Sequence, residues 1–191
     1  MFENINSDLN RYSRSGNRTY WETFRILCGY PGALATVIYR YNRYVRRNIK
    51  NIILRKFFSV IGVFLFKMME ILYGIHIEPE IDIGPGFYIG HFGNIILGGD
   101  TKIGKNCNIS QEVTVGYAGR GNKWGLPVIG DYVYIGPGAK IFGKIVIGNH
   151  VAIGANAVVT KDLPDMAVAV GVPAKIISFQ GSRDFIVIHN E

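Results

Sequence analysis

The chain has 191 residues, of which 48% are hydrophobic, and a formal net charge of +7. This length and composition suit one folded domain, or a domain with an appendage, and they exclude disorder on a large scale. The charge is uneven, because residues 1–75 carry +8 and residues 76–191 carry −1. Cys28 and Cys107 have neither disulfide nor metal-ligand spacing, which is consistent with a reducing compartment. The N-terminus lacks the apolar core of a signal peptide, so we expect a cytoplasmic protein.

Residues 1–75 are predicted to form an N-terminal helical region. Residues 1–19 are polar and show no sustained period, which predicts a loose arm. Helix-forming segments follow from Tyr20 to about Tyr73. Pro31 and Gly32 separate the first helix from a second that runs from about Ala33 to Asn48, and a third begins near Asn51.

The third predicted helix contains an apolar stretch that basic residues precede. Residues 57–66 contain no charge, but ten residues are half of the roughly 20 that a spanning helix needs, so we expect no transmembrane helix. A helix that lies at the membrane surface through residues 40–67, or that packs on another subunit, remains open. Seven basic residues lie before this uncharged stretch, and no acidic residue lies between them: Arg40, Arg43, Arg46, Arg47, Lys50, Arg55 and Lys56. Such a basic run could bind anionic lipid or a phosphate-bearing ligand, or could simply be a helix face exposed to solvent. It contains no recognised nucleic-acid-binding motif, so we expect no nucleic acid partner.

From residue 76 the chain follows a period of six. Aliphatic residues recur at Ile83, Ile89, Leu97, Ile103, Ile109, Val115, Ile129, Ile135, Ile141, Ile147, Ile153 and Val159. Two residues earlier, a second series holds small or β-branched side chains at Thr101, Cys107, Val113, Val133, Ala139, Val151 and Ala157. Residues six apart do not share one face of an α-helix, whereas six-residue pieces suit the flat sides of a parallel β-helix. The pattern therefore predicts a β-helix over 76–178, with both series pointing inward.

The repeat is interrupted twice before it ends. It slips by two residues around His91 to Leu97, and it is broken by a polar, basic and glycine-rich segment at 116–128. We expect that segment to be a loop over a binding site. Pro164 and Pro173 end the regular pattern. Residues 179–191 are predicted to be an extended tail that adds an edge strand or covers a neighbour.

Several segments resemble the hexapeptide-repeat acyltransferases, and among them the serine acetyltransferase-like branch. The resemblance covers about residues 74–178 and rests on IGHFGNIIL, ISQEVTVG, VIGDYVYIGPGAKIFG and the terminal AVGVPAK. It implies a mainly β fold, a left-handed parallel β-helix after an N-terminal helical region. It also implies a homotrimer, and acetyl transfer from acetyl-CoA to a hydroxyl at sites between subunits, without a metal. Pairing of trimers into hexamers through the helices remains open.

The resemblance also implies site residues. His91 matches the family's catalytic histidine, and a histidine with a pKa near about 6.5 is suited to deprotonate a hydroxyl. Its carboxylate partner is left open among Glu78, Glu112 and Asp100, whereas His76, His150 and His189 match no catalytic motif. Matching places the contacts to acetyl-CoA at Gly116, Tyr117, Ala118, Pro137, Gly138 and Ala155, with Lys161 and Lys175 near its phosphates.

Positions at which this sequence differs from the family indicate which kind of acceptor substrate it binds. Serine acetyltransferases carry an Asp before the catalytic histidine and an Arg-His pair before the loop's closing proline, where this chain has Gly90 and Gly125–Leu126. An uncharged acceptor needs no such ionic anchors, so we expect a sugar hydroxyl in surface polysaccharide biosynthesis. Tyr88, Phe92, Gln111 and Trp124 would hold it. A sugar on a polyprenyl phosphate would place the enzyme at the inner face of the membrane. The alternatives are a serine O-acetyltransferase of cysteine biosynthesis and, in another class, a non-catalytic trimeric scaffold.

Overall fold

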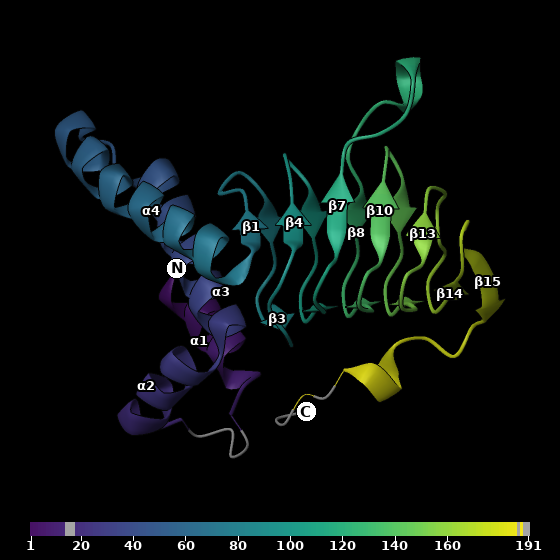
Figure 1. Ribbon diagram of the computed structural model, residues 1–191, viewed down its shortest axis with the longest axis horizontal. Coiled ribbons are helices and arrows are strands. Elements are labelled where there is room, and N and C mark those ends of the chain that lie inside the picture. Colours follow the sequence, from purple (N-terminus) through teal and green to yellow (C-terminus); the bar gives the residue numbers. More distant parts are fainter. Residues whose placement is uncertain (14–17, 187, 189–191) are drawn as a thin grey trace.

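The computed structural model describes residues 1–13, 18–186 and 188. Within them, helices at one end adjoin a three-sided stack of short strands (Figure 1). The helices are α1 (Phe2–Asn10), α2 (Tyr20–Gly29), α3 (Pro31–Asn48) and α4 (Ile52–Tyr73). The second predicted helix begins two residues earlier than expected, because Pro31 occupies its first turn, where a missing N–H costs nothing. No helix of the described part of the chain is long and apolar enough to cross a membrane.

The strands form three sheets that share one axis. The first, sheet A, contains β1 (Ile75–Ile77), β4 (Ile95–Leu97), β7 (Thr114–Gly116), β10 (Lys140–Phe142) and β13 (Val158–Val159). Sheet B contains β2 (Asp82–Ile83), β5 (Lys102–Ile103), β8 (Val128–Ile129) and β11 (Val146–Ile147). Sheet C contains β3 (Tyr88–Ile89), β6 (Asn108–Ile109), β9 (Tyr134–Ile135), β12 (Ala152–Ile153), β14 (Val168–Val170) and β15 (Lys175–Ser178). All pairs are parallel except β14 with β15.

The two inward series of the hexad pattern fill the interior of this left-handed β-helix. Each of the twelve predicted aliphatic side chains is at most 3% exposed, and the seven side chains of the second series are all 0% exposed. Register aligns the repeat in successive coils, as Ile109 pairs with Ile135 and Ile141 with Val159. The predicted fold class is therefore confirmed, and the strands stack so that each coil buries the hydrophobic side of the next.

The predicted loose arm over residues 1–19 is wrong for residues 2–10, because they form helix α1, which closes the open end of the β-helix. Residues 14–17 of that arm lie outside the described residues. Asp8 is fully buried, forms an ion pair with Arg40 of α3 at 2.8 Å, and accepts a hydrogen bond from the Phe87 amide at 2.9 Å. Tyr12 bridges the amide and carbonyl of Ile89 through its hydroxyl, at 3.0 and 3.1 Å.

Two side chains of α3 and one that follows α1 complete this closure. Tyr39 donates its hydroxyl proton to the Ile81 carbonyl at 2.7 Å, and Arg40 donates to the carbonyls of Ile83 and Gly84 at 2.5 and 2.6 Å. Arg11 donates to the Gly86 carbonyl at 2.8 Å. Asp8, Arg11, Tyr12, Tyr39 and Arg40, which we call the capping cluster, thus satisfy backbone groups that a preceding coil would otherwise pair.

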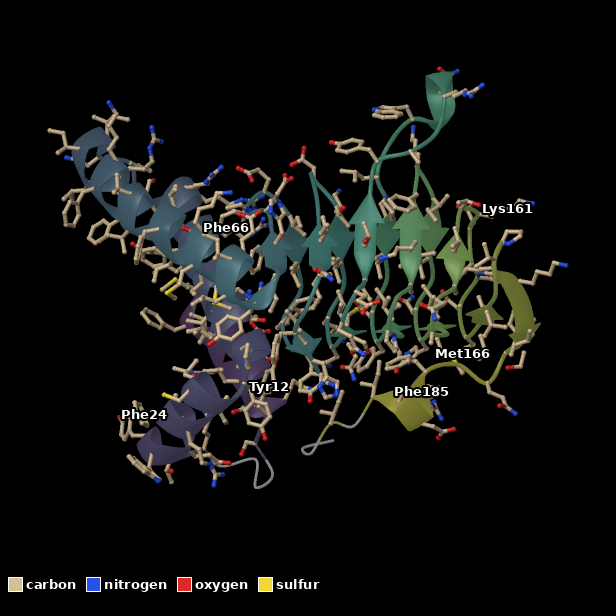
Figure 2. All side chains as sticks on the ribbon, in the orientation of Figure 1. Tyr12, Phe24, Phe66, Lys161, Met166 and Phe185 are labelled. Carbon is tan, nitrogen blue, oxygen red and sulfur yellow. The ribbon has the colours of Figure 1, made fainter. Side chains whose placement is uncertain are left out.

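At the other end, the C-terminal segment folds back along sheet C of its own chain. The Ser182 amide donates to the His150 carbonyl at 3.0 Å, and the Phe185 ring stacks on Tyr134 at a centroid distance of 4.7 Å. Figure 2 shows Phe185 beside the β-helix rather than beyond its end. A short 3-10 helix at Arg183–Phe185 replaces part of the predicted extended tail. Residues 187 and 189–191, including His189, lie outside the described residues, so the predicted edge strand stays untested there.

Candidate active site

His91 lies at the corner where the chain turns from sheet C into sheet A in the first coil. Strand β3 ends at Ile89 and β4 begins at Ile95, so the predicted two-residue slip is the longer turn at this corner. The turn exposes the His91 side chain, and no interaction found in the described part of the chain involves its ring. The imidazole is therefore free to meet a substrate.

The same corner recurs in each following coil, one above the other. The Glu112 amide donates to the Gly93 carbonyl at 2.7 Å, the Gly138 amide to the Gln111 carbonyl at 2.9 Å, and the Asn156 amide to the Pro137 carbonyl at 2.8 Å. We call this ladder the His91 corner, and it contains residues 90–94, 110–112, 136–138 and 154–156. It brings four predicted site residues into line with His91, namely Gln111, Pro137, Gly138 and Ala155.

Gln111 supplies a polar group that the protein itself leaves unused. Its Oε1 atom is buried and has no hydrogen-bond partner among the described residues. An acceptor that is buried without a partner costs free energy unless a ligand donates to it. One coil below, Phe92 is half exposed and contacts Tyr73 of α4 edge to face, at a centroid distance of 5.5 Å.

Tyr88, another predicted acceptor-binding residue, is occupied by the helical region. Its ring packs on Tyr12 at a centroid distance of 4.6 Å, and the Arg11 guanidinium lies 5.6 Å from its centroid. Burial raises the pKa of the Tyr88 hydroxyl. The structure therefore places Tyr88 in the packing of the capping cluster.

Among the described residues, none of the three carboxylate candidates forms a hydrogen bond or ion pair with His91. Glu78 accepts a hydrogen bond from the Gly99 amide at 3.0 Å and lies 3.7 Å from His76, and His76 also lies 3.0 Å from Glu70. The Glu70 carboxyl has its pKa lowered by hydrogen bonds from Lys67 and His76. This acidic environment of His76 was not predicted, although Glu70 and Glu78 lie only six and two residues from it in the sequence. No group of three His, Cys, Asp or Glu in the described residues is placed to hold a metal ion.

Four other predicted cofactor residues lie at the opposite edge of sheet A. Gly116 ends β7, Tyr117 and Ala118 follow it, and Lys161 follows β13. The segment at 116–128 leaves the β-helix here as a projecting loop (Figure 1), closed by hydrogen bonds of 3.1 and 3.3 Å between Ala118 and Gly125. Figure 2 shows Lys161 on the same side of the prism as this loop. We call this edge the loop corner.

Aromatic rings give the projecting loop its chemical character. Tyr117 and Trp124 stack at a centroid distance of 5.7 Å and are 49% and 58% exposed. Such rings offer flat apolar faces to a ligand. Lys175, at the start of β15, lies instead beside the His91 corner in the last coil, where the Ala174 amide donates to the Val158 carbonyl at 2.8 Å.

The two corners are separated by the width of sheet A. Strands β7 and β10 have three residues each, and a rise of about 3.3 Å per residue puts the corners roughly 10 Å apart. His91 and the projecting loop of one chain therefore do not enclose one common pocket. A ligand that touches both must extend across the sheet, or the two corners must come from different chains.

Comparison with known proteins adds an independent line of argument. The family model described as bacterial transferase hexapeptide (six repeats) matches residues 127–161. A serine acetyltransferase of Helicobacter pylori (strain J99) is 36% identical over 161 residues, which is 84% of this chain and 88% of that protein. The chain belongs to the hexapeptide-repeat acyltransferases. It is accordingly an acetyl-CoA-dependent O-acetyltransferase, as the sequence predicts.

Solved structures of this family share the architecture of more than nine tenths of the chain. Serine acetyltransferase of Neisseria gonorrhoeae in complex with serine aligns with a TM-score of 0.75 and 29% identity, covering 93% of this chain and 69% of that one. A serine acetyltransferase in complex with CoA aligns with a TM-score of 0.72 and 28% identity, covering 91% and 68%. The acyltransferase expectation is confirmed, whereas none of these relatives is described as acting on a saccharide, so the saccharide branch has no support from them.

Proposed function

We propose that His91 is the general base of acetyl transfer. The observation that carries this proposal is the exposed imidazole at the stacked corner, next to Gln111, whose Oε1 acceptor has no hydrogen-bond partner among the described residues. Acetyl-CoA would supply an acetyl thioester there. His91 would take the proton of the acceptor hydroxyl while the hydroxyl oxygen attacks the thioester carbonyl, and would return that proton to the departing thiolate. The residues of the His91 corner fit such a ligand, since small side chains and backbone groups line it.

The assignment is tested by a matched pair of histidine variants. Removal of a general base lowers the rate by about 10²–10⁴-fold, so His91→Ala should lose turnover by that factor. His150→Asn is the control, because His150 stacks on Tyr132 at a corner between sheets B and C and has a positive φ that Asn tolerates. Turnover is followed as release of free CoA thiol. Equal turnover of the two variants would refute the role of His91.

We propose L-serine as the first acceptor to test. The relatives reported above are serine acetyltransferases, one of them with serine bound, and one is similar over most of both chains. The saccharide expectation finds no such support.

A second candidate acceptor is a neutral sugar hydroxyl, and a specific observation favours it. Gly90 precedes His91, and Gly125 and Leu126 end the projecting loop, so these positions offer no charge to bind an ammonium or carboxylate group. The stacked Tyr117 and Trp124 instead offer aromatic faces. Thiol release with L-serine at sub-millimolar concentration would establish the first acceptor. Release with neutral saccharides, and with serine only at far higher concentration, would establish the second.

We further propose that each site is shared between chains of a homotrimer. Three copies around one axis would bury exposed apolar side chains such as Val128 and Val146 of sheet B, and a closed ring leaves no unpaired interface. The loop corner of one chain could then face the His91 corner of another. Subunits with His91→Ala, mixed with subunits with Tyr117→Ala and Trp124→Ala, should regain activity that neither parent has. No recovery in verified mixed trimers would contradict the shared site.

A further inference from the structure

Helix α4 presents an apolar surface that nothing in the described chain covers. Ile53, Phe57, Val60, Phe64 and Ile71 recur at helical spacing and are between 61% and 78% exposed. Their spacing places them on one side of the helix, which we call the apolar stripe. Gly62 and Met69 on the other side are buried, and α3 packs against α4 through the hydrogen bond from Asn42 Nδ2 to the Gly62 carbonyl at 3.2 Å. Helix α4 is therefore anchored by one side and free on the other.

The charges near the first half of the apolar stripe are basic, and Glu70, which lies beside Ile71 at its end, is paired with Lys67 and His76. Residues 41–69 contain no acidic residue. Arg40, Arg43 and Arg46 are paired with Asp8, Asp82 and Glu80. For the remaining bases near the start of α4, no ion pair is found within the described residues; these are Arg47, Lys50, Arg55 and Lys56. The surface that meets the stripe should therefore be apolar and anionic.

The apolar stripe and the nearby basic residues together favour one binding partner for this surface over others. A second copy of α4 packed in parallel would bring the same cations face to face, which is unfavourable at short range. An anionic lipid surface offers acyl chains to the stripe and negative headgroups to its bases. The 22 residues of α4 extend about 33 Å, and no described helix is apolar enough to cross a bilayer, so α4 would lie in the plane of the interface.

The apolar stripe leads to the His91 corner. Helix α4 ends at Tyr73, whose ring contacts Phe92, and the Ile95 amide donates to the Gly74 carbonyl at 2.9 Å. Figure 1 shows α4 extending from the β1 end of the prism, away from β15. We propose that α4 docks the enzyme on an anionic membrane surface and so presents His91 to a hydroxyl acceptor that resides at that surface. The part about the acceptor rests on the proposed function; the docking itself does not.

Vesicle binding tests the docking with the full chain. Sucrose-loaded vesicles of phosphatidylcholine alone, or mixed with phosphatidylglycerol, are sedimented with the purified protein. Phe57→Asp with Phe64→Asp should weaken partitioning onto the mixed vesicles by at least about tenfold, because two charges enter the buried side of an interfacial helix. Lys50→Glu with Lys56→Glu should reduce it similarly and abolish its salt dependence. The control is Ile177→Asp with Phe179→Asp, which alters two residues that are 64% and 61% exposed near β15.

The outcomes separate docking from catalysis. Binding to mixed vesicles that the stripe variant loses and the control keeps supports the proposal, provided that the stripe variant retains thiol release with a soluble acceptor. Wild-type protein that stays in the supernatant with both vesicle types overturns it. So does a stripe variant that dissociates a larger assembly by sedimentation without changing vesicle binding, since a second copy then covers the stripe. Loss of turnover in His91→Ala with unchanged vesicle binding leaves the docking intact.

Discussion

Replacing Asp8 with alanine should destabilise the protein far more than a surface ion pair would. The Asp8 and Arg40 side chains are 0% and 3% exposed, and their atoms lie 2.8 Å apart at the closest contact. Asp8→Ala leaves the Arg40 guanidinium buried without its counter-charge and removes the acceptor of the Phe87 amide. Removing one partner of a buried ion pair lowers the free energy of unfolding by about 3–5 kcal/mol. That is a large fraction of the stability of about 5–15 kcal/mol that is typical of a domain.

Arg43 and Asp82 provide a matched control on the same face of α3. They form an ion pair of the same type, but the Asp82 side chain is 61% exposed. Exposed pairs contribute about 0–1 kcal/mol, so Asp82→Ala should change the free energy of unfolding by no more than that. Asp8→Asn separates charge from hydrogen bonding, because it keeps an acceptor for Phe87 and still leaves Arg40 unpaired. Most of the loss should therefore persist in Asp8→Asn.

The assay is urea unfolding followed by far-ultraviolet circular dichroism at one subunit concentration, because assembly makes apparent stability depend on concentration. The expected result is a lower unfolding midpoint for Asp8→Ala and Asp8→Asn, and a nearly unchanged midpoint for Asp82→Ala. If Asp8→Ala costs no more than Asp82→Ala, the capping cluster does not stabilise the open end of the β-helix and the reasoning fails.

Two further predictions concern buried groups. Tyr12→Phe should cost about 1–3 kcal/mol in the same urea assay, because it leaves the amide and carbonyl of Ile89 without their partner; an unchanged midpoint would mean that water replaces the hydroxyl. Burial raises the pKa of the Cys107 thiol to about 12, so its reactive thiolate stays scarce until the pH approaches that value. From about pH 7 to about pH 9, iodoacetamide should modify the exposed Cys28 and leave Cys107 unmodified, as read by peptide mass spectrometry; early loss of the Cys107 thiol would contradict its burial.

The β-helix could be predicted because its energetics are local in sequence. Each inward position repeats after six residues, and a side chain such as Ile135 contacts its equivalents in the neighbouring coils. The interruption at 116–128 and the slip at His91 were visible as breaks in the same pattern. The helices α2 to α4 were predicted for a related reason, since their apolar positions recur within each helix.

Helix α1 could not be predicted because long-range polar contacts stabilise it. Asp8 meets Arg40 across 32 residues, Tyr12 meets Ile89 across 77, and Arg11 meets Asn108 across 97. A polar segment without periodicity gives no sign of such partners. The surroundings of His91 were equally hidden: the unused Gln111 acceptor depends on how two coils stack, and the loop corner lies about 10 Å away across sheet A.

The helices present two different surfaces, one packed on the β-helix and one exposed on the outer side of α4. On the side that meets the β-helix, Ala35, Ile38 and Met69 join the hydrophobic core of the first coil. The capping cluster beside them supplies the donors and acceptors that the unpaired amides and carbonyls of that open end need. On the outer side of α4, apolar side chains prevail, although water would favour polar ones. Closing the end of the β-helix does not require that outer stripe. The presence of ten exposed large apolar side chains on one helix, close to the basic residues at its start, therefore argues for a second surface with a function of its own.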